Sequence, residues 1–233
     1  MLEQWPTLSR NQISSFIMQG KVTVDGKTVT KAGSLFSAEA KIVCDVEEPK
    51  FVCRAGYKLE RALQAFNIDV KGLIILDAGL STGGFTDCLL QWGAKKVYGV
   101  DVGYGQVHEK IRTDQRVEVI ERTNLRYLEQ LPEKVDLVTL DLSFISVLKV
   151  MPAVIKLMKD QSALIVLIKP QFEAERHQVG KGGIIRDESI HDEVIKNVTK
   201  GIESYGFTCS GVVESPIHGS MGNKEFLAYF VRS

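Results

Sequence analysis

Two charged side chains occupy positions in this sequence where α/β enzymes often place catalytic groups. Asp141 directly follows the mostly apolar run at 135–140, and Lys169 directly follows the six apolar residues 163–168. Both runs are typical of buried strands, and open α/β sheets place their sites at the carboxyl ends of such strands. A buried ammonium group needs a partner, and Asp141 could supply it. The pair is a candidate for proton transfer or charge stabilisation, with a structural ion pair as the alternative.

Lys58 and Glu225 are two further charged residues that could join this site. Lys58 begins an amphipathic pattern at 58–66 that predicts a helix, and Glu225 opens the run 225–231 that predicts the last strand. Taken alone, each is more simply interpreted as a solvated residue, because most helix lysines and strand-edge glutamates face water. They become candidates only in combination with the first pair.

A glycine-rich turn at 77–87 follows the apolar run 73–76 and precedes the expected start of a helix at 85–90. Doubly wound sheets bind cofactors at such turns, because glycine allows close approach and the helix N-terminus offers free N–H groups. The spacing does not match the G-x-G-x-x-G of dinucleotide sites, and the acidic start suits the sulfonium and ammonium groups of S-adenosylmethionine. The alternative is a turn whose glycines serve geometry only. The expected cofactor contacts in this turn are Asp77, Gly79, Ser81, Thr82, Gly83, Gly84 and Phe85.

Asp101 is the expected contact for the sugar of the cofactor. It follows the run 96–100, which predicts the second strand of the sheet. A carboxylate at that position can accept hydrogen bonds from both hydroxyls of a ribose.

Composition favours an enzyme of a reducing compartment. The 233 residues carry 29 Lys and Arg against 29 Asp and Glu, so any nucleic-acid contact must use a local basic face. The four cysteines lack C-x-x-C spacing and the four histidines are scattered, so neither a metal site nor a disulfide framework is predicted. The apolar runs are too short to span a bilayer, so no membrane partner is expected. We expect a cytoplasmic location if the source is bacterial, or a plastid or mitochondrion if it is eukaryotic and processed.

The first 46 residues predict a small α+β module, followed by a linker at 47–54. A helix is expected over 9–20, with Ser9 as its N-cap and Gly20 as its stop. Residues 21–30 alternate around Asp25-Gly26, which is a strong hairpin signal, and a third strand is expected at 40–45.

This module resembles the S4 RNA-binding module through Arg10, the helix that ends at Gly20, and the motif at 22–26. In that family the helix and hairpin present basic residues to structured RNA. The S4 module usually begins with another helix, of which only residues 1–5 remain here. The alternative is that the cations are ordinary surface residues. The resemblance implies RNA contacts by Arg10, Lys21, Lys27 and Lys31.

From residue 55 to 233 the pattern alternates between strands and helices. It predicts a mostly parallel sheet with helices on both faces, as in a Rossmann-like class I methyltransferase. The last two strands, joined around 219–222, are expected to form an edge pair, and an antiparallel last strand would distinguish a methyltransferase sheet from a plain dinucleotide fold. The principal helices are expected at 143–158 and 188–205. The strands are expected at 73–76, 96–100, 117–120, 135–141, 163–168, 208–213 and 225–231.

Eight motifs occur in the same order as in the TlyA family, which joins an S4 module to an FtsJ-like methyltransferase domain. The resemblance covers nearly the whole chain. Family members use S-adenosylmethionine to methylate ribose 2′-hydroxyls of cytidines in ribosomal RNA, and some bear a hemolysin label. Cys53 and Leu80 depart mildly from the family pattern. The motifs lie at 54–60, 77–87, 101–106, 121–124, 141–146, 169–173, 179–183 and 222–226.

The resemblance also implies roles for individual residues. The family's Lys-Asp-Lys-Glu tetrad falls on the four charged residues considered first. A lysine at a strand end can act as the base for a ribose hydroxyl, or can remain charged and stabilise the oxyanion. Gly79 and Gly83 would admit the methionine part of the cofactor, Asn124 and Asp141 would contact the cofactor, and Arg54 would contact RNA. The implied catalytic residues are Lys58, Asp141, Lys169 and Glu225.

Two other classes of function remain open at this level. A nicotinamide-dependent dehydrogenase can use the same fold, although the missing G-x-G-x-x-G and the charged tetrad argue against it. A non-catalytic RNA-binding or hemolysin-like protein is the other alternative. The target nucleotide and the oligomeric state are left open.

Overall fold

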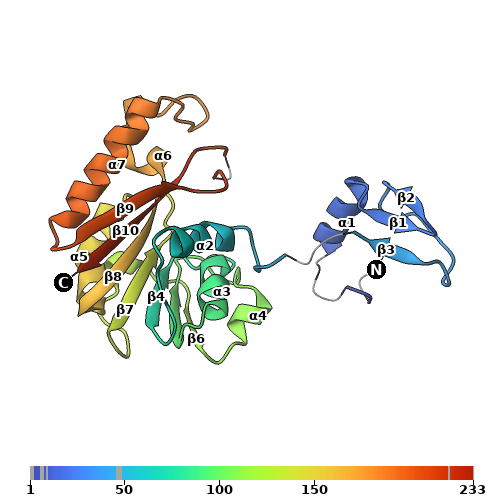
Figure 1. Cartoon of the computed structure of the whole chain (residues 1–233), viewed down its shortest axis with the longest axis horizontal. Coiled ribbons are helices and arrows are strands. Elements are labelled where there is room, and N and C mark those ends of the chain that lie inside the picture. Colours follow the sequence, from blue (N-terminus) through green and yellow to red (C-terminus); the bar gives the residue numbers. More distant parts are fainter. Residues whose placement is uncertain (1–2, 6–7, 9, 46–48, 220, 233) are drawn as a thin grey trace. The chain divides into compact units, whose positions relative to one another are not determined.

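The computed structural model describes residues 3–5, 8, 10–45, 49–219 and 221–232. The chain forms two compact units, residues 1–50 and residues 51–233 (Figure 1).

The N-terminal unit contains one helix and a three-stranded antiparallel sheet in the order β2-β1-β3. Asp25 and Gly26 connect β1 to β2 with φ angles of 49° and 78°, which is the left-handed pair that a two-residue hairpin turn requires. The predicted hairpin is therefore confirmed. Gly20, with φ of 71°, ends the helix, whereas the expected cap at Ser9 lies outside the described residues. The elements are α1 (Arg10–Met18), β1 (Val22–Val24), β2 (Lys27–Val29) and β3 (Ile42–Cys44).

The second unit is built on a seven-stranded sheet in the order β6-β5-β4-β7-β8-β10-β9. The strands β4 to β8 run parallel, as predicted. The strand β10 is antiparallel to both of its neighbours, which is the feature that distinguishes a methyltransferase sheet from a plain dinucleotide fold. Of the last two strands, β9 alone is an edge strand, because β10 inserts between β8 and β9. The strands are β4 (Ile74–Ala78), β5 (Lys96–Val100), β6 (Val117–Ile120), β7 (Val135–Leu140), β8 (Met158–Ile168), β9 (Thr208–Glu214) and β10 (Phe226–Arg232).

Helices cover both faces of this sheet and bury one core each (Figure 1). Alternate residues of β8 show the division: Leu164 and Val166 face α5 and α7, whereas Ile165 faces α2, α3 and α4. The expected layers are confirmed. The helices are α2 (Ala55–Ala65), α3 (Gly84–Gln91), α4 (Glu109–Arg112), α5 (Met151–Leu157), α6 (Pro170–Glu173) and α7 (Glu188–Glu203), with short 3₁₀ turns η1 (Leu125–Tyr127), η2 (Val147–Lys149) and η3 (Arg176–Gln178).

The single helix expected at 143–158 is wrong. Phe144 has φ of 65°, which no helix accommodates, and the segment forms η2 and then α5. Pro152 lies in the first turn of α5, where its missing N–H costs nothing. The strand β8 begins at Met158, five residues earlier than the apolar run indicates, and its first residues are partly exposed.

The order of the strands along the chain reverses direction between β4 and β7, which makes this position a topological switch point of the sheet. The strands β5 and β6 extend the sheet on one side of β4, and β7 and β8 extend it on the other. Loops that leave β4, β5 and β7 at their carboxyl ends therefore diverge around a crevice, which is where open α/β sheets bind their ligands.

Candidate active site

A cavity of about 540 Å³ lies at the carboxyl ends of β4, β5 and β7. That volume is in the range of a small-molecule site. Five of the predicted cofactor residues line it, and they come from the loops after these strands and after β6. These residues are Gly79, Ser81, Asp101, Asn124 and Asp141.

The Asp101 carboxylate organises the β5 side of the cavity. Its two oxygens accept hydrogen bonds from the backbone N–H groups of Ser81 and Gly103, each at 2.7 Å. These bonds fix the side chain across two loops. Each carboxylate oxygen can accept a second hydrogen bond, so the group can still receive donors from a ligand.

Gly79 brings the turn after β4 against the end of β7. Its φ is 91°, and an added Cβ would lie 2.3 Å from the Asp141 carbonyl oxygen. Only glycine fits this contact. The Asp141 N–H also donates to the Ala78 carbonyl oxygen at 2.9 Å, so the Asp141 side chain leaves the sheet from a fixed backbone position.

The other residues predicted in the turn support it from behind and do not line the cavity. Asp77 is fully buried and accepts hydrogen bonds from the hydroxyls of Thr86, at 2.7 Å, and Thr139, at 2.9 Å. Burial raises the pKa of Asp77 to about 6. Phe85 belongs to the core, and the Thr82 carbonyl accepts from His108. Cofactor contact by these side chains stays a prediction.

The remaining glycines of the turn make room for packing. A Cβ on Gly83 would lie 2.8 Å from Ile111, and a Cβ on Gly84 would lie 2.5 Å from the Cys53 sulfur. Leu80 departs from the family pattern. It fits here because Gly99 on β5 leaves space for it, since a Cβ added to Gly99 would lie 2.7 Å from the Leu80 side chain. These positions are required by packing, whatever the cofactor contacts are.

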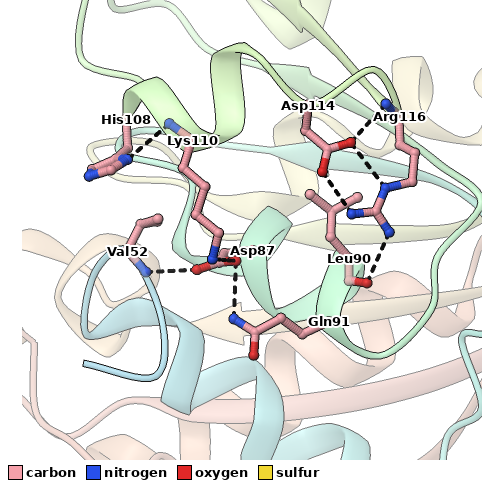
Figure 2. A network of polar contacts seen from close by, with 8 residues as sticks. All are labelled: Val52, Asp87, Leu90, Gln91, His108, Lys110, Asp114 and Arg116. Carbon is pink, nitrogen blue, oxygen red and sulfur yellow. Dashed lines mark hydrogen bonds and ion pairs between the residues drawn. The ribbon is translucent and has the colours of Figure 1, made fainter. Parts of the chain in front are cut away.

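A polar network anchors the helix that follows the turn. Asp87 is buried in α3 and accepts hydrogen bonds from the Val52 N–H, the Gln91 side chain and the Lys110 ammonium (Figure 2). The distances are 2.8, 3.1 and 2.9 Å respectively. This carboxylate ties the first residues of the unit, the glycine-rich turn and α4 together.

The four predicted catalytic residues meet as two ion pairs. The Lys169 Nζ lies 2.6 Å from Asp141 Oδ1 and donates to the Ser143 hydroxyl at 2.9 Å. The Lys58 Nζ lies 2.5 Å from Glu225 Oε2. All four side chains are largely withdrawn from solvent. Their role in catalysis stays a prediction.

Several cavity residues were not named among the predicted site residues, although they lie inside the family motifs: Gln106, Thr123, Ser143 and Phe144. Phe144 is 90% exposed, has φ of 65°, and its ring centroid lies 5.0 Å from that of Phe172. An exposed aromatic ring in a left-handed conformation is unusual. It lies inside the motif at 141–146, but no periodicity marks a loop residue as a cavity wall.

The five cations predicted to contact RNA are all exposed. Four belong to the N-terminal unit, and Arg54 belongs to the second unit, directly before α2. None of the five forms an ion pair within the part of the chain that the structure describes. The four in the N-terminal unit are Arg10, Lys21, Lys27 and Lys31.

The described residues show neither a metal-binding cluster nor a membrane-spanning helix. No group of three or more His, Cys, Asp or Glu side chains among them could hold a metal ion. No helix in the described ranges is both long enough and apolar enough to cross a membrane.

Each of the two units matches a known protein family. The family model described as FtsJ-like methyltransferase matches residues 51–232, and the S4 domain model matches residues 6–42. Hemolysin A of Brachyspira hyodysenteriae is 42% identical over 97% of this chain and 95% of its own length. The 16S/23S rRNA (cytidine-2′-O)-methyltransferase TlyA of Mycobacterium tuberculosis is 42% identical over 95% of this chain and 84% of its own. A solved Streptococcus thermophilus protein, described as a proposed hemolysin, is 41% identical with a TM-score of 0.80, covering 97% of this chain and 83% of that one.

Proposed function

The chain belongs to the FtsJ-like methyltransferase family, and from this premise we propose that it transfers a methyl group from S-adenosylmethionine to a ribose 2′-hydroxyl of ribosomal RNA, with cytidine as the nucleoside. The observation that carries the proposal is the Lys169 ammonium, held between Asp141 and Ser143. Asp141 and Ser143 also line the cavity. The family argues against the dehydrogenase that the turn alone left open.

The residues around the cavity fit S-adenosylmethionine. Asp101 keeps acceptor capacity for two ribose hydroxyls, and Gly79 and Ser81 bring backbone to the cavity wall without bulk. Asn124, whose side-chain oxygen accepts from the Arg126 N–H, would lie near the adenine. When bound, the cofactor supplies an electrophilic methyl group on a sulfonium centre.

Lys169 carries the chemical step in this proposal. A ribose hydroxyl is a weak nucleophile, so its proton must leave or its developing charge must be stabilised as it attacks. Neutral Lys169 can accept that proton, and charged Lys169 can stabilise the oxyanion. Asp141 and Ser143 orient the ammonium in either case, at 2.6 and 2.9 Å. Lys58 and Glu225 would position the ribose and set the charge around Lys169.

The RNA is proposed to bind through the N-terminal unit. The S4 match and the four exposed cations of this unit support this assignment, with Arg54 as a further contact at the start of the second unit. The proposed bounds are 1–46 for the S4-like module, 47–54 for the linker and 55–233 for the methyltransferase domain, and the last four linker residues already belong to the compact second unit, which begins at Phe51. An rRNA substrate implies action where ribosomes are assembled, which in bacteria is the cytoplasm.

The direct test is methyl transfer from labelled S-adenosylmethionine to ribosomal RNA or subunits, with the modified position mapped by mass spectrometry. A 2′-O-methylcytidine that depends on the protein supports the proposal, and the absence of any labelled nucleoside on free RNA and on both subunits refutes it. The variant Asp101→Ala should weaken cofactor binding by about 1.5–3 kcal/mol per lost bond. Calorimetric titration that shows equal affinity for the variant and the wild type would remove Asp101 from the cofactor site.

A further inference from the structure

The Glu225 carboxylate is confined more closely than the other members of the tetrad. Its side chain is 3% exposed, and one oxygen, Oε2, pairs with Lys58. The other oxygen occupies space left by a glycine, since an added Cβ on Gly219 would lie 2.5 Å from Oε1. The Glu225 carbonyl accepts from the Ser215 N–H at 2.9 Å, which sets the backbone at the start of β10.

Asn223, two residues earlier, joins this segment to a second loop. It is 1% exposed, and its amide nitrogen donates to the Gly183 carbonyl at 2.8 Å. Its amide oxygen accepts from the Ile185 N–H at 2.9 Å. Its own carbonyl accepts from the Gly219 N–H at 2.9 Å. The amide oxygen and the amide nitrogen of the side chain therefore both bind the same loop. The Asn223 backbone carbonyl binds Gly219 in the turn that packs against Glu225.

The loop that Asn223 holds buries Ile185 but forms few backbone hydrogen bonds of its own among the described residues. The segment 180–185 connects η3 to α7 without regular structure, and Gly182 and Gly183 take φ angles of 79° and 76°. Its internal bonds are Gly180 N–H to Ile184 O at 3.2 Å and Gly183 N–H to Gly180 O at 3.0 Å. This loop follows β8 by way of α6 and η3, and the turn that contains Gly219 leads into β10, whose first residue pairs with the last residue of β8. Asn223 is a buried polar link between them.

We propose that Asn223 is a positioning residue for the Lys58–Glu225 pair: its amide clamps the 180–185 loop to the turn before β10 and so fixes the Glu225 carboxylate. The inference rests on the proposed methyl transfer and deepens it, because nothing else assigns a role to the motifs at 179–183 and 222–223. Loss of the clamp frees Glu225 to shift. A displacement of about 1 Å in a catalytic arrangement can cost on the order of 100-fold in rate.

The variant Asn223→Asp separates positioning from bulk stability. An ionised aspartate still accepts from the Ile185 N–H, but it turns an acceptor toward the Gly183 carbonyl. A protonated aspartate donates to that carbonyl and restores the clamp. Burial and the hydrogen bond made by the neutral form both raise the pKa of such a carboxyl. The rate of the variant relative to the wild type should therefore recover as the pH falls.

The experiment measures single-turnover methyl transfer by the full chain between about pH 6 and about pH 9, with cofactor affinity and melting temperature measured in parallel. The variants are Asn223→Asp, Asn223→Ala and Gly219→Ala, and the control is Asn197→Asp, the same chemical change on the exposed face of α7. Near the upper end we expect losses on the order of 10- to 100-fold for the three test variants, with unchanged cofactor affinity. Only Asn223→Asp should recover toward low pH, and the control should match the wild type throughout.

The outcomes distinguish this inference from the function on which it rests. A wild-type chain that methylates no ribosomal RNA overturns the proposed function. A wild-type chain that is active, with Asn223→Asp and Gly219→Ala at its rate across the pH range, overturns the clamp alone. So does an Asn223→Asp variant that lowers melting temperature and rate without any recovery at low pH, because that pattern describes a structural amide.

Discussion

The two ion pairs of the tetrad have the same chemistry but different surroundings. Asp141 keeps 16% of its side chain exposed and lines the cavity, and Lys169 has a second partner in Ser143. Lys58 and Glu225 are 8% and 3% exposed, and neither lines the cavity. The first pair therefore meets the cavity through the Asp141 carboxylate, although the Lys169 side chain, 9% exposed, is nearly as buried as that of Lys58. The second pair is enclosed, so we infer that it acts on the substrate through the geometry it maintains.

The largest expected effect is on the open pair. Lys169→Ala and Lys169→Arg should lower methyl transfer by a factor on the order of 10²–10⁴, because alanine removes the charge and arginine can neither act as a base nor keep the shape. Cofactor and RNA affinities should change little, since the interactions of Lys169 strengthen in the transition state. Lys169→Met, which keeps the length of the side chain but removes the charge, should lose activity as well. Single-turnover kinetics of the three variants measures these losses.

The same strand provides a matched control for this prediction. Lys159 also pairs with an aspartate, Asp136 at 2.6 Å, but it lies near the other end of β8. Lys159→Met should be fully active. Substantial activity in a folded Lys169→Met would make the open pair structural, and the contrast between the two pairs would then disappear.

The enclosed pair should show a smaller effect on rate and a larger one on stability. Lys58→Met or Glu225→Leu leaves one charge buried without its partner, which typically costs about 3–5 kcal/mol of unfolding free energy. The double variant removes both charges and should recover much of that stability. Its methyl transfer should stay lower by a factor on the order of 10–100, if geometry at this position serves the reaction.

Urea unfolding and single-turnover rates on the same samples test both parts. Recovery of stability together with the wild-type rate in the double variant would show that the enclosed pair only holds the fold. An unstable double variant would show instead that apolar side chains cannot replace the pair at this position.

The difference between the pairs also explains what the sequence could predict. Asp141 and Lys169 each follow an apolar run, and parallel strands bring their carboxyl ends together, so the contact was predictable from strand pattern alone. Lys58 and Glu225 lie 167 positions apart, and only the resemblance to a family grouped them. Their contact depends on β10 inserting beside β8, which places α2 near the start of the last strand.

Loop residues were the least predictable part of the site. Gln106, Thr123 and Phe144 lie in segments without hydrophobic periodicity, so no pattern marks the side that faces the cavity. The helix predicted at 143–158 failed for a related reason, because no sequence pattern marks Phe144 for the left-handed backbone that it adopts. Conversely, Asp77 was predicted as a cofactor contact from its place in the turn, and the structure shows it bonded to Thr86 and Thr139.

Asp77 differs from the carboxylates of both ion pairs. It is buried, and among the described residues its partners are two threonine hydroxyls and no ammonium group. Its folded pKa of about 6 lies above its ordinary value of 3.8, because desolvation outweighs the two threonine hydrogen bonds. The contribution of this group to stability is therefore fully present below about pH 4 and is lost as the pH rises through about 6. The loss is on the order of 2–3 kcal/mol.

The variant Asp77→Asn should lack this pH dependence. Its melting temperature relative to the wild type should rise as the pH increases from about 4 to about 7. Thermal unfolding across that range measures the difference, with Asp192→Asn on the exposed face of α7 as the control. Parallel curves for Asp77→Asn and the wild type would show that the buried carboxyl titrates normally.

The smallest expected effects are those of substituting the exposed cations of the N-terminal unit. These side chains stay in water, where each contact with an RNA phosphate contributes little to affinity. Lys27→Gln and Lys31→Gln should each weaken binding to an rRNA fragment only a few-fold and should lower the slope of log affinity against log salt by about 1. Lys196→Gln, an exposed lysine of α7, should leave the slope unchanged. Fluorescence anisotropy between about 50 and 200 mM salt measures the slope. Because these cations only hold RNA, transfer at saturating RNA should keep its rate. A lower rate there would place them in the chemistry, and an unchanged slope would remove them from the RNA interface.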